Sequence, residues 1–224
     1  ITTPFSSSST TENGGTVSSK VRLESAPLSP VTITLNSSDT QEGTVSPTVL
    51  TFNKDNWDSY VSIIVTGVDD DIADGSQSYE IQIASVVSED SKYSALNGQI
   101  NPIKLQNEDD EIKAIVLGSL SGDTTEAGGN ATFSVKLASK PIEAVSIPII
   151  STDTSEGTVN VSSLSFDNSN YNTVQIVTVN GEDDDERDGN IAYQVKIGPT
   201  TSNSLPYNNV CLLYTSPSPR DEKV

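Results

Sequence analysis

Two stretches of the sequence concentrate carboxylates in the same order: GVDDDIADG at residues 67–75 and GEDDDERDG at residues 181–189. Each holds three consecutive aspartates and a fourth one three residues later, and the single cation in either stretch is Arg187. Like charges this close repel one another, so a folded protein that keeps them needs a counter-charge. The chemistry that such residues can perform is the coordination of a cation by carboxylate oxygens.

Further carboxylates recur at matching positions in the two halves of the chain. In the first half the acidic positions are Glu12, Asp39, Asp69, Asp70, Asp71, Asp74 and the run from Glu108 to Glu111. In the second half they are Glu126, Asp153, Asp183, Asp184, Asp185 and Asp188. All of them lie just before or after a strand-like run, and the loops of a β-sandwich gather at its ends. Carboxylates that are distant in the sequence are therefore expected to converge.

Calcium is the cation that suits such a set of ligands. It accepts six to eight oxygens in irregular geometry, whereas magnesium demands a strict octahedron and keeps its waters. Zinc, iron and copper prefer histidine or cysteine, but the chain has no histidine and one cysteine. A linear EF-hand loop is excluded because Ala73 stands where that loop needs Asp or Asn. The sequence thus predicts a calcium site assembled from several loops.

The elements that must position these loops are β-strands in a tandem repeat. A shift of 114 residues aligns residues 11–83 with residues 125–197 without a gap. Apolar residues alternate with polar ones, which is typical of half-buried strands. The alternating runs are Val17, Val21 and Leu23; Val31, Ile33 and Leu35; Tyr79, Ile81 and Ile83; Phe133, Val135 and Leu137; and Tyr193, Val195 and Ile197. We expect an all-β chain of two tandem immunoglobulin-like antiparallel β-sandwiches, with about seven strands each.

Composition excludes several classes of function. The formal net charge of −19 opposes binding to nucleic acid, whose phosphates would be repelled. No run of about 18 apolar residues is present, so we expect no membrane span in this segment. Without histidine there is no Ser-His or Cys-His pair, and the carboxylates crowd together instead of forming an isolated acid–base pair. The chain is predicted not to be an enzyme.

Several motifs together resemble the Calx-beta family, which includes calcium-binding domains of sodium/calcium exchangers and tandem modules of large bacterial surface proteins. In the first copy the motifs are TENGGTVSSKVRLES, SSDTQEGTVSP, LTFNKDNW, VTGVDDDIADG and LQNEDDE. The second copy has TEAGGNATFSVKLAS, STDTSEGTV, LSFDNSNY and VNGEDDDERDG. The resemblance covers nearly all of residues 1–210 and is closest to the bacterial modules.

The resemblance implies which residues hold calcium. In the first copy these are Glu12, Asp39, Asp69, Asp70, Asp71, Asp74, Asp109, Asp110 and Glu111. In the second copy they are Glu126, Asp153, Asp183, Asp184, Asp185 and Asp188, without the final acidic run. The competing interpretation is that these runs are solvated loops, and that Asp39 and Asp153 bond only their own turns. Glu42 and Glu156 are expected at the surface, and Trp57 and Tyr171 in packing roles.

The function that follows is structural. The resemblance implies calcium-rigidified repeat modules of a large extracellular adhesin or surface filament protein, found outside the cell or on its surface. Its partners would be neighbouring modules of the same chain, other copies in a filament, or a ligand on a cell surface. The alternative is a glycan- or partner-binding accessory module of a secreted multidomain protein, although aromatic residues make up only 5% of the chain. A calcium sensor also stays open.

The expected domains are residues 1–110, residues 111–210 and a tail of residues 211–224. The tail begins CLLYTSPSPRD, which resembles the translation of a transposase-type sequencing adapter. We therefore expect residues from Cys211 onward not to be natural protein, and the second module to end before its last strand. Because Ile1 aligns with Ile115, we also expect the natural protein to contain further modules.

Overall fold

The computed structural model of the chain describes residues 6–183, 189–203 and 207–215. Its elements are strands apart from one four-residue helix, α1 (Ser91–Ser94), so the predicted all-β class is confirmed. The chain divides into two compact units. The first comprises the residues up to Asp70 and Asp74–Asp110, and the second comprises Asp71–Ala73 and the residues from Glu111 onward. Each unit is a sandwich of two sheets.

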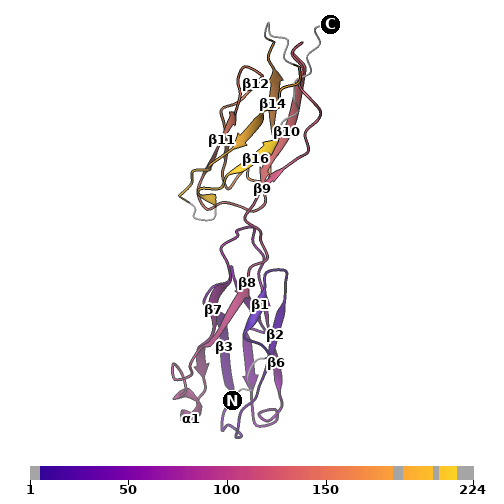
Figure 1. Cartoon of the computed structure of the whole chain (residues 1–224). Coiled ribbons are helices and arrows are strands. Elements are labelled where there is room, and N and C mark those ends of the chain that lie inside the picture. Colours follow the sequence, from indigo (N-terminus) through magenta and orange to yellow (C-terminus); the bar gives the residue numbers. More distant parts are fainter. Residues whose placement is uncertain (1–5, 184–188, 204–206, 216–224) are drawn as a thin grey trace. The chain divides into compact units, whose positions relative to one another are not determined.

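The first unit packs a five-stranded sheet, in the order β1-β8-β7-β3-β5, against a three-stranded sheet, β2-β6-β4 (Figure 1). Its strands are β1 Ser9–Thr11, β2 Thr16–Val21, β3 Val31–Ser37, β4 Gly43–Ser46, β5 Val49–Phe52, β6 Val61–Gly67, β7 Gln77–Val87 and β8 Ile103–Glu108. All pairings in these sheets are antiparallel except that of β1 with β8, which is parallel. The first and last strands of the unit are therefore neighbours that run in the same direction.

The alternating residues of the first copy fill the space between these sheets. Val17, Val21 and Leu23 are buried, as are Val31, Ile33 and Leu35. One run departs from the prediction, because Ile83 is only half-buried although it packs against the core. The register of β3 and β7 shifts between Thr34 and Leu35, and a bulge of this kind changes which face successive residues occupy.

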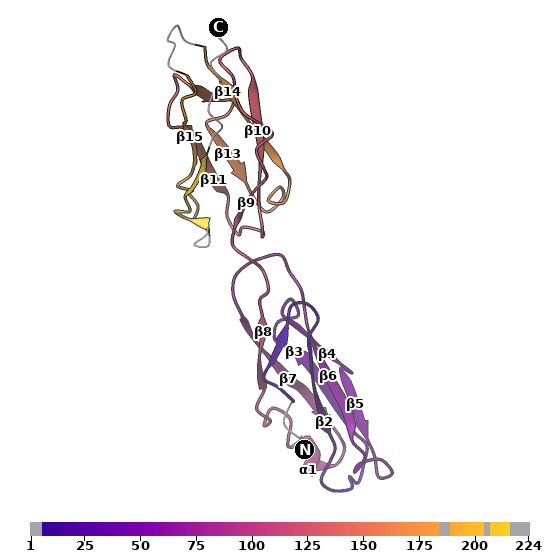
Figure 2. The same ribbon diagram turned by 45° about the vertical axis from the view of Figure 1, so that its right-hand side comes forward.

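The second unit has two four-stranded sheets, β12-β14-β10-β9 and β13-β11-β15-β16 (Figure 2). Its strands are β9 Ile115–Leu117, β10 Asn130–Leu137, β11 Val145–Ser151, β12 Gly157–Val159, β13 Ser163–Phe166, β14 Gln175–Gly181, β15 Gln194–Ile197 and β16 Leu212–Thr215. Its core contains the predicted inward residues Phe133, Val135, Leu137, Tyr193, Val195 and Ile197.

The two units share internal contacts at positions 114 residues apart. The Thr10 and Tyr79 hydroxyls lie 2.9 Å apart, and those of Thr124 and Tyr193 lie 3.0 Å apart. A Cβ on Gly43 would collide with the Tyr79 ring, as one on Gly157 would with Tyr193, so both positions need glycine.

Two further pairs of equivalent residues match as well. The Tyr93 hydroxyl donates to the Ser25 carbonyl at 2.6 Å, and that of Tyr207 to Ser139 at 2.9 Å. Trp57 and Tyr171 pack against their respective cores, which confirms their predicted packing role.

A strand also forms within the tail. β16 pairs antiparallel with β15, with Leu212 opposite Ile197, at the place where no further strand of the module was expected. An open sheet edge presents unpaired backbone groups that an adjacent apolar segment can satisfy. The natural or foreign origin of residues 211–224 is a separate question and stays a prediction.

Candidate metal centre

Glu12 lies where the chain leaves β1 and turns back into β2. Its N–H donates to the Glu108 carbonyl at 3.0 Å, which extends the contact between β1 and β8 by one residue. The turn that follows is closed by Gly14 N–H donating to the Thr11 carbonyl at 3.1 Å, and Gly14 has a φ of 83°. Glu12 is held by backbone on both sides, and its side chain is only 2% exposed.

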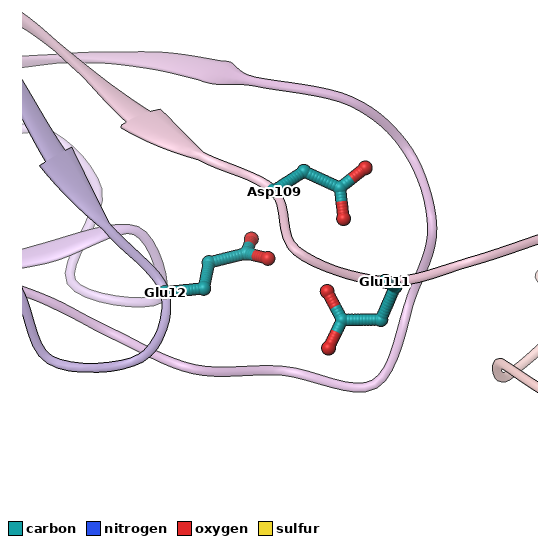
Figure 3. A group of neighbouring side chains, drawn as sticks. All are labelled: Glu12, Asp109 and Glu111. Atoms are coloured by element: carbon teal, nitrogen blue, oxygen red, sulfur yellow. The ribbon is translucent and has the colours of Figure 1, made fainter.

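Asp109 and Glu111 reach the same place from β8. Because β1 and β8 are parallel neighbours, they end at the same edge of the sheet, and the carboxylates that follow them converge. Figure 3 shows the three side chains directed toward a common space. Carboxylate oxygens of Glu12, Asp109 and Glu111 all lie within 4.8 Å of one another. The predicted convergence of residues almost a hundred positions apart thus has a structural cause in strand direction.

Charge and burial make this group costly without a partner cation. Two unit charges about 4 Å apart repel by about 4 kcal/mol at the effective dielectric typical of a protein surface. The Oε2 atoms of Glu12 and Glu111 are buried and accept no hydrogen bond among the described residues, although both side chains have other interactions. No lysine or arginine occurs in the contributing segments, residues 9–15, 68–75 and 107–112. A divalent ion bound by these oxygens would remove the repulsion.

Asp69, which follows β6, takes part in a second group. Its carboxylate oxygen and those of Asp110 and Glu111 also lie within 4.8 Å of one another, and here Asp69 and Asp110 are exposed. Glu111 is common to both groups. The two groups together bring five of the predicted ligands close to the end of β8.

Gly75 anchors the aspartate loop to this end of the sheet. Its N–H donates to Asp109 Oδ2 at 2.5 Å, and its φ of 81° is a conformation that glycine adopts readily. The last glycine of GVDDDIADG therefore orients one of the carboxylates. This role was not predicted. Gly189, which ends the second stretch, has the same backbone conformation, with a φ of 82°.

Glu42 is a further carboxylate at this end of the unit, and its placement corrects the expectation of a surface residue. It is half-buried, and burial raises the pKa of its carboxyl above the ordinary value. A hydrogen bond from Asn107 Nδ2 at 3.5 Å lowers that pKa in part. The charges of Asp74, Asp39 and Asp70 raise this pKa further.

Glu156, the counterpart of Glu42, is also misplaced by the surface prediction, since it is only 7% exposed. The signal that could have found both residues is the sequence EGTV, which is identical at 42–45 and 156–159. In each unit the backbone carbonyl of this glutamate accepts a hydrogen bond, from Val68 N–H in one and from Glu182 N–H in the other, both at 3.1 Å.

The remaining predicted ligands of the first unit do not join either group of three. Asp39 Oδ1 accepts a hydrogen bond from Gln41 N–H at 2.9 Å, which is the turn-stabilising role. The charges of Asp70 and Asp74 raise the pKa of Glu42, and Asp71 is grouped with the second unit.

In the second unit, Glu126 repeats the burial of Glu12. It is 5% exposed, and its Oε2 atom is buried without a hydrogen bond among the described residues, although the side chain has another interaction. Asp153 stabilises its own turn, because its Oδ1 accepts bonds from Ser155 Oγ at 2.5 Å and Ser155 N–H at 3.0 Å, and these lower its pKa. Asp183 is exposed, and Asp184, Asp185 and Asp188 lie outside the described residues. Within the described part of this unit, no group of three carboxylates forms.

No family model and no curated protein matches the chain. Among solved structures, calcium-binding domain CBD12 of CALX1.1 is 14% identical with a TM-score of 0.37, covering 87% of this chain and 76% of that one. S-layer protein SbsC domains 4 and 5 are 13% identical with a TM-score of 0.34, covering 83% and 76%. SSP-19 of Caenorhabditis elegans, an MSP-domain protein like family member, is 11% identical with a TM-score of 0.28, covering 45% and 90%. Similarity at this level carries no argument about ligands.

Among the described residues, no helix has the length and apolar character that crossing a bilayer requires.

Proposed function

We propose that the first unit is a calcium-binding structural module, and that the chain is a segment of a repetitive extracellular surface protein that calcium stiffens. The observation that carries this proposal is the group formed by Glu12, Asp109 and Glu111, with oxygens within 4.8 Å of one another. The tandem repeat and the resemblance of its motifs to Calx-beta modules support the same conclusion.

The donor set fits calcium better than other biological cations. All the side chains in the two groups are carboxylates, which are hard oxygen ligands. The two groups share Glu111 and differ in burial, so the site is irregular and partly open, as calcium tolerates and magnesium does not. The chain offers no histidine, and its one cysteine, Cys211, is exposed and outside these groups.

Calcium would act here by stabilising the loops that surround the end of β8. Extracellular calcium modules have dissociation constants of roughly 10⁻⁴ to 10⁻³ M. At a hundredfold excess of free ion, one site stabilises the folded state by about 2.7 kcal/mol. That amount is a large part of the stability of a small domain. The segment through which the chain continues beyond β8 would be rigid with calcium and loose without it, which suits a structural element of an adhesin or surface filament.

The test is thermal unfolding of the full chain in calcium at about a hundred times the dissociation constant, in chelator, and in magnesium at the same concentration as calcium. At saturating calcium we expect one transition to rise by about 10 to 20 °C, because 1 kcal/mol shifts the midpoint of a domain of this size by roughly 4 to 8 °C. Magnesium should produce a small fraction of that shift. Identical midpoints in all three conditions would show that the carboxylates are solvated loops, and the proposal would be abandoned.

A further inference from the structure

Three Asn-Gly pairs occur in the sequence: Asn13-Gly14, Asn97-Gly98 and Asn180-Gly181. Asparagine is a thermolabile residue. Its side-chain amide is most vulnerable before glycine, because the missing Cβ lets the next backbone nitrogen approach the amide carbon. Whether each pair can react depends on how firmly the fold holds its side chain and backbone.

The Asn13-Gly14 pair is the one that the fold leaves most accessible. It is exposed in the turn between β1 and β2, and a Cβ built on Gly14 would meet nothing within 4 Å. The Asn13 Oδ1 accepts a hydrogen bond from Thr11 Oγ1 at 2.6 Å. That bond is local to the turn and polarises the amide carbonyl toward attack. The attacking Gly14 N–H donates to the Thr11 carbonyl at 3.1 Å, a bond within the same turn that must open before the ring closes.

Asn97 is exposed as well, but its side chain is tied to another element. Its Oδ1 accepts a hydrogen bond from Val86 N–H at 2.9 Å, which connects the loop to β7. Rotation of the amide toward Gly98 would break that bond. We therefore expect Asn97 to react more slowly than Asn13.

Asn180 is the most protected of the three. It lies within β14, which pairs with β10 on one side and β12 on the other. The Gly181 N–H donates to the Gly129 carbonyl at 3.1 Å, and a Cβ on Gly181 would collide with the backbone of Thr125, so the attacking nitrogen is closely surrounded. Reaction at Asn180 requires local unfolding of a central strand.

We infer that Asn13 is a self-modification site of the folded chain. The Gly14 nitrogen, after losing its proton to solvent base, attacks Cγ of Asn13; the Cγ–Nδ2 bond breaks and ammonia leaves. Water then opens the resulting succinimide at either carbonyl, giving aspartate or its β-linked isomer. The net reaction consumes one water and releases one ammonia. The second unit has Ala127 at the equivalent position and cannot react there.

The product changes the charge beside the candidate metal centre. A new carboxylate appears immediately after Glu12, in a turn whose backbone positions that residue. The β-linked product also lengthens the backbone of the turn by one carbon. The significance for calcium rests on the proposed function, whereas the modification itself does not.

Peptide mapping by mass spectrometry tests the modification. The full chain is incubated at mildly alkaline pH, once folded and once in denaturant, and the acid content of the three Asn-Gly peptides is followed. In denaturant the three should react at similar rates. In the folded chain Asn13 should keep the largest fraction of its unfolded rate, and Asn180 should fall roughly tenfold or more below its own unfolded rate, because local opening of a central strand is rare. An Asn13→Ala variant, which copies the second unit, identifies the peptide signal.

A folded-state rate at Asn13 no higher than those at Asn97 and Asn180 would overturn the inference. Calcium provides a separate comparison. Ion binding at Glu12 should rigidify the turn and slow the reaction at Asn13 while leaving Asn97 unchanged. If calcium has no effect on the Asn13 rate, the calcium site is contradicted and the modification site stands.

Discussion

The acidic ends of the two units differ although the strands that build them match. Both units bury the glutamate that begins the repeat, with Glu12 2% and Glu126 5% exposed. Both also bury or half-bury the glutamate of EGTV. Only in the first unit, within the described residues, do other carboxylates join the buried glutamate, and they come from the residues that follow β8.

The difference indicates that the buried glutamate is a property of the repeat, whereas the full group of three carboxylates depends on the last strand. In the first unit β8 lies parallel to β1 and delivers Asp109 and Glu111 to Glu12. In the second unit β16 occupies the corresponding edge of β15, but its residues, Leu212–Thr215, include no carboxylate. The two units therefore form a natural experiment in one chain.

The largest effect should come from Glu12→Gln compared with Glu126→Gln. The Glu12 variant should lose the calcium-dependent stabilisation of about 2.7 kcal/mol. In chelator it should be as stable as the wild type or more so, since one of three repelling charges is gone. Glu126→Gln should keep the calcium effect. Calorimetry measures both variants, with Asp58→Asn as an exposed control. Loss of the calcium response in Glu126→Gln alone would contradict the assignment of the calcium site to the group around Glu12.

A smaller difference is expected between Tyr193→Phe and Tyr79→Phe. Thr10 also donates to Asn107 Oδ1 at 3.0 Å, so its hydroxyl keeps a partner when the Tyr79 hydroxyl is removed. Thr124 is fully buried, and Tyr193 is the partner that the structure gives its hydroxyl. Tyr79→Phe should cost about 1 kcal/mol and Tyr193→Phe about 2 to 3 kcal/mol, because a buried donor without an acceptor is costly. Denaturant unfolding measures both, and equal costs would show that Asn107 gives no protection.

The smallest effect concerns pH and Asp90, the N-cap of α1. Hydrogen bonds from Leu28 N–H at 2.9 Å and Lys92 N–H at 3.0 Å lower the pKa of Asp90 below its ordinary value of 3.8. A carboxyl whose folded-state pKa is lowered stabilises the fold above the unfolded value, and that contribution disappears as pH falls through the folded value. Asp90→Asn should lower the unfolding midpoint at pH 7, and the difference should shrink as pH falls below the ordinary value of 3.8. A difference that is constant from pH 7 to pH 2 would contradict the assignment to charge.

Much of the fold was predictable because the repeat and the period-two runs are local signals. Val17, Val21 and Leu23 point inward as expected, and so do Phe133, Val135 and Leu137. The bulge that turns Ile83 partly outward was not predictable, since it depends on the register between β3 and β7.

The candidate site was predictable in its chemistry and only partly in its geometry. Glu12, Asp69, Asp109, Asp110 and Glu111 come together, but Asp39 serves its own turn. The burial of Glu42 and Glu156 was missed because charge alone favours the surface. Each of them directly precedes a glycine, Gly43 or Gly157, against which the ring of Tyr79 or Tyr193 packs. That contact joins residues far apart in the sequence, and its local trace is the shared sequence EGTV.

The parallel pairing of β1 and β8 also determines how the first unit would respond to mechanical tension. The chain enters along β1 and leaves along β8 in the same direction, so a pull on its two ends drags these adjacent strands in opposite senses. The hydrogen bonds between them, together with the Thr10–Asn107 bond, then carry the load in shear, all at once rather than one after another. An ion bound by Glu12 and Asp109 would sit at the end of the same ladder and resist the same displacement.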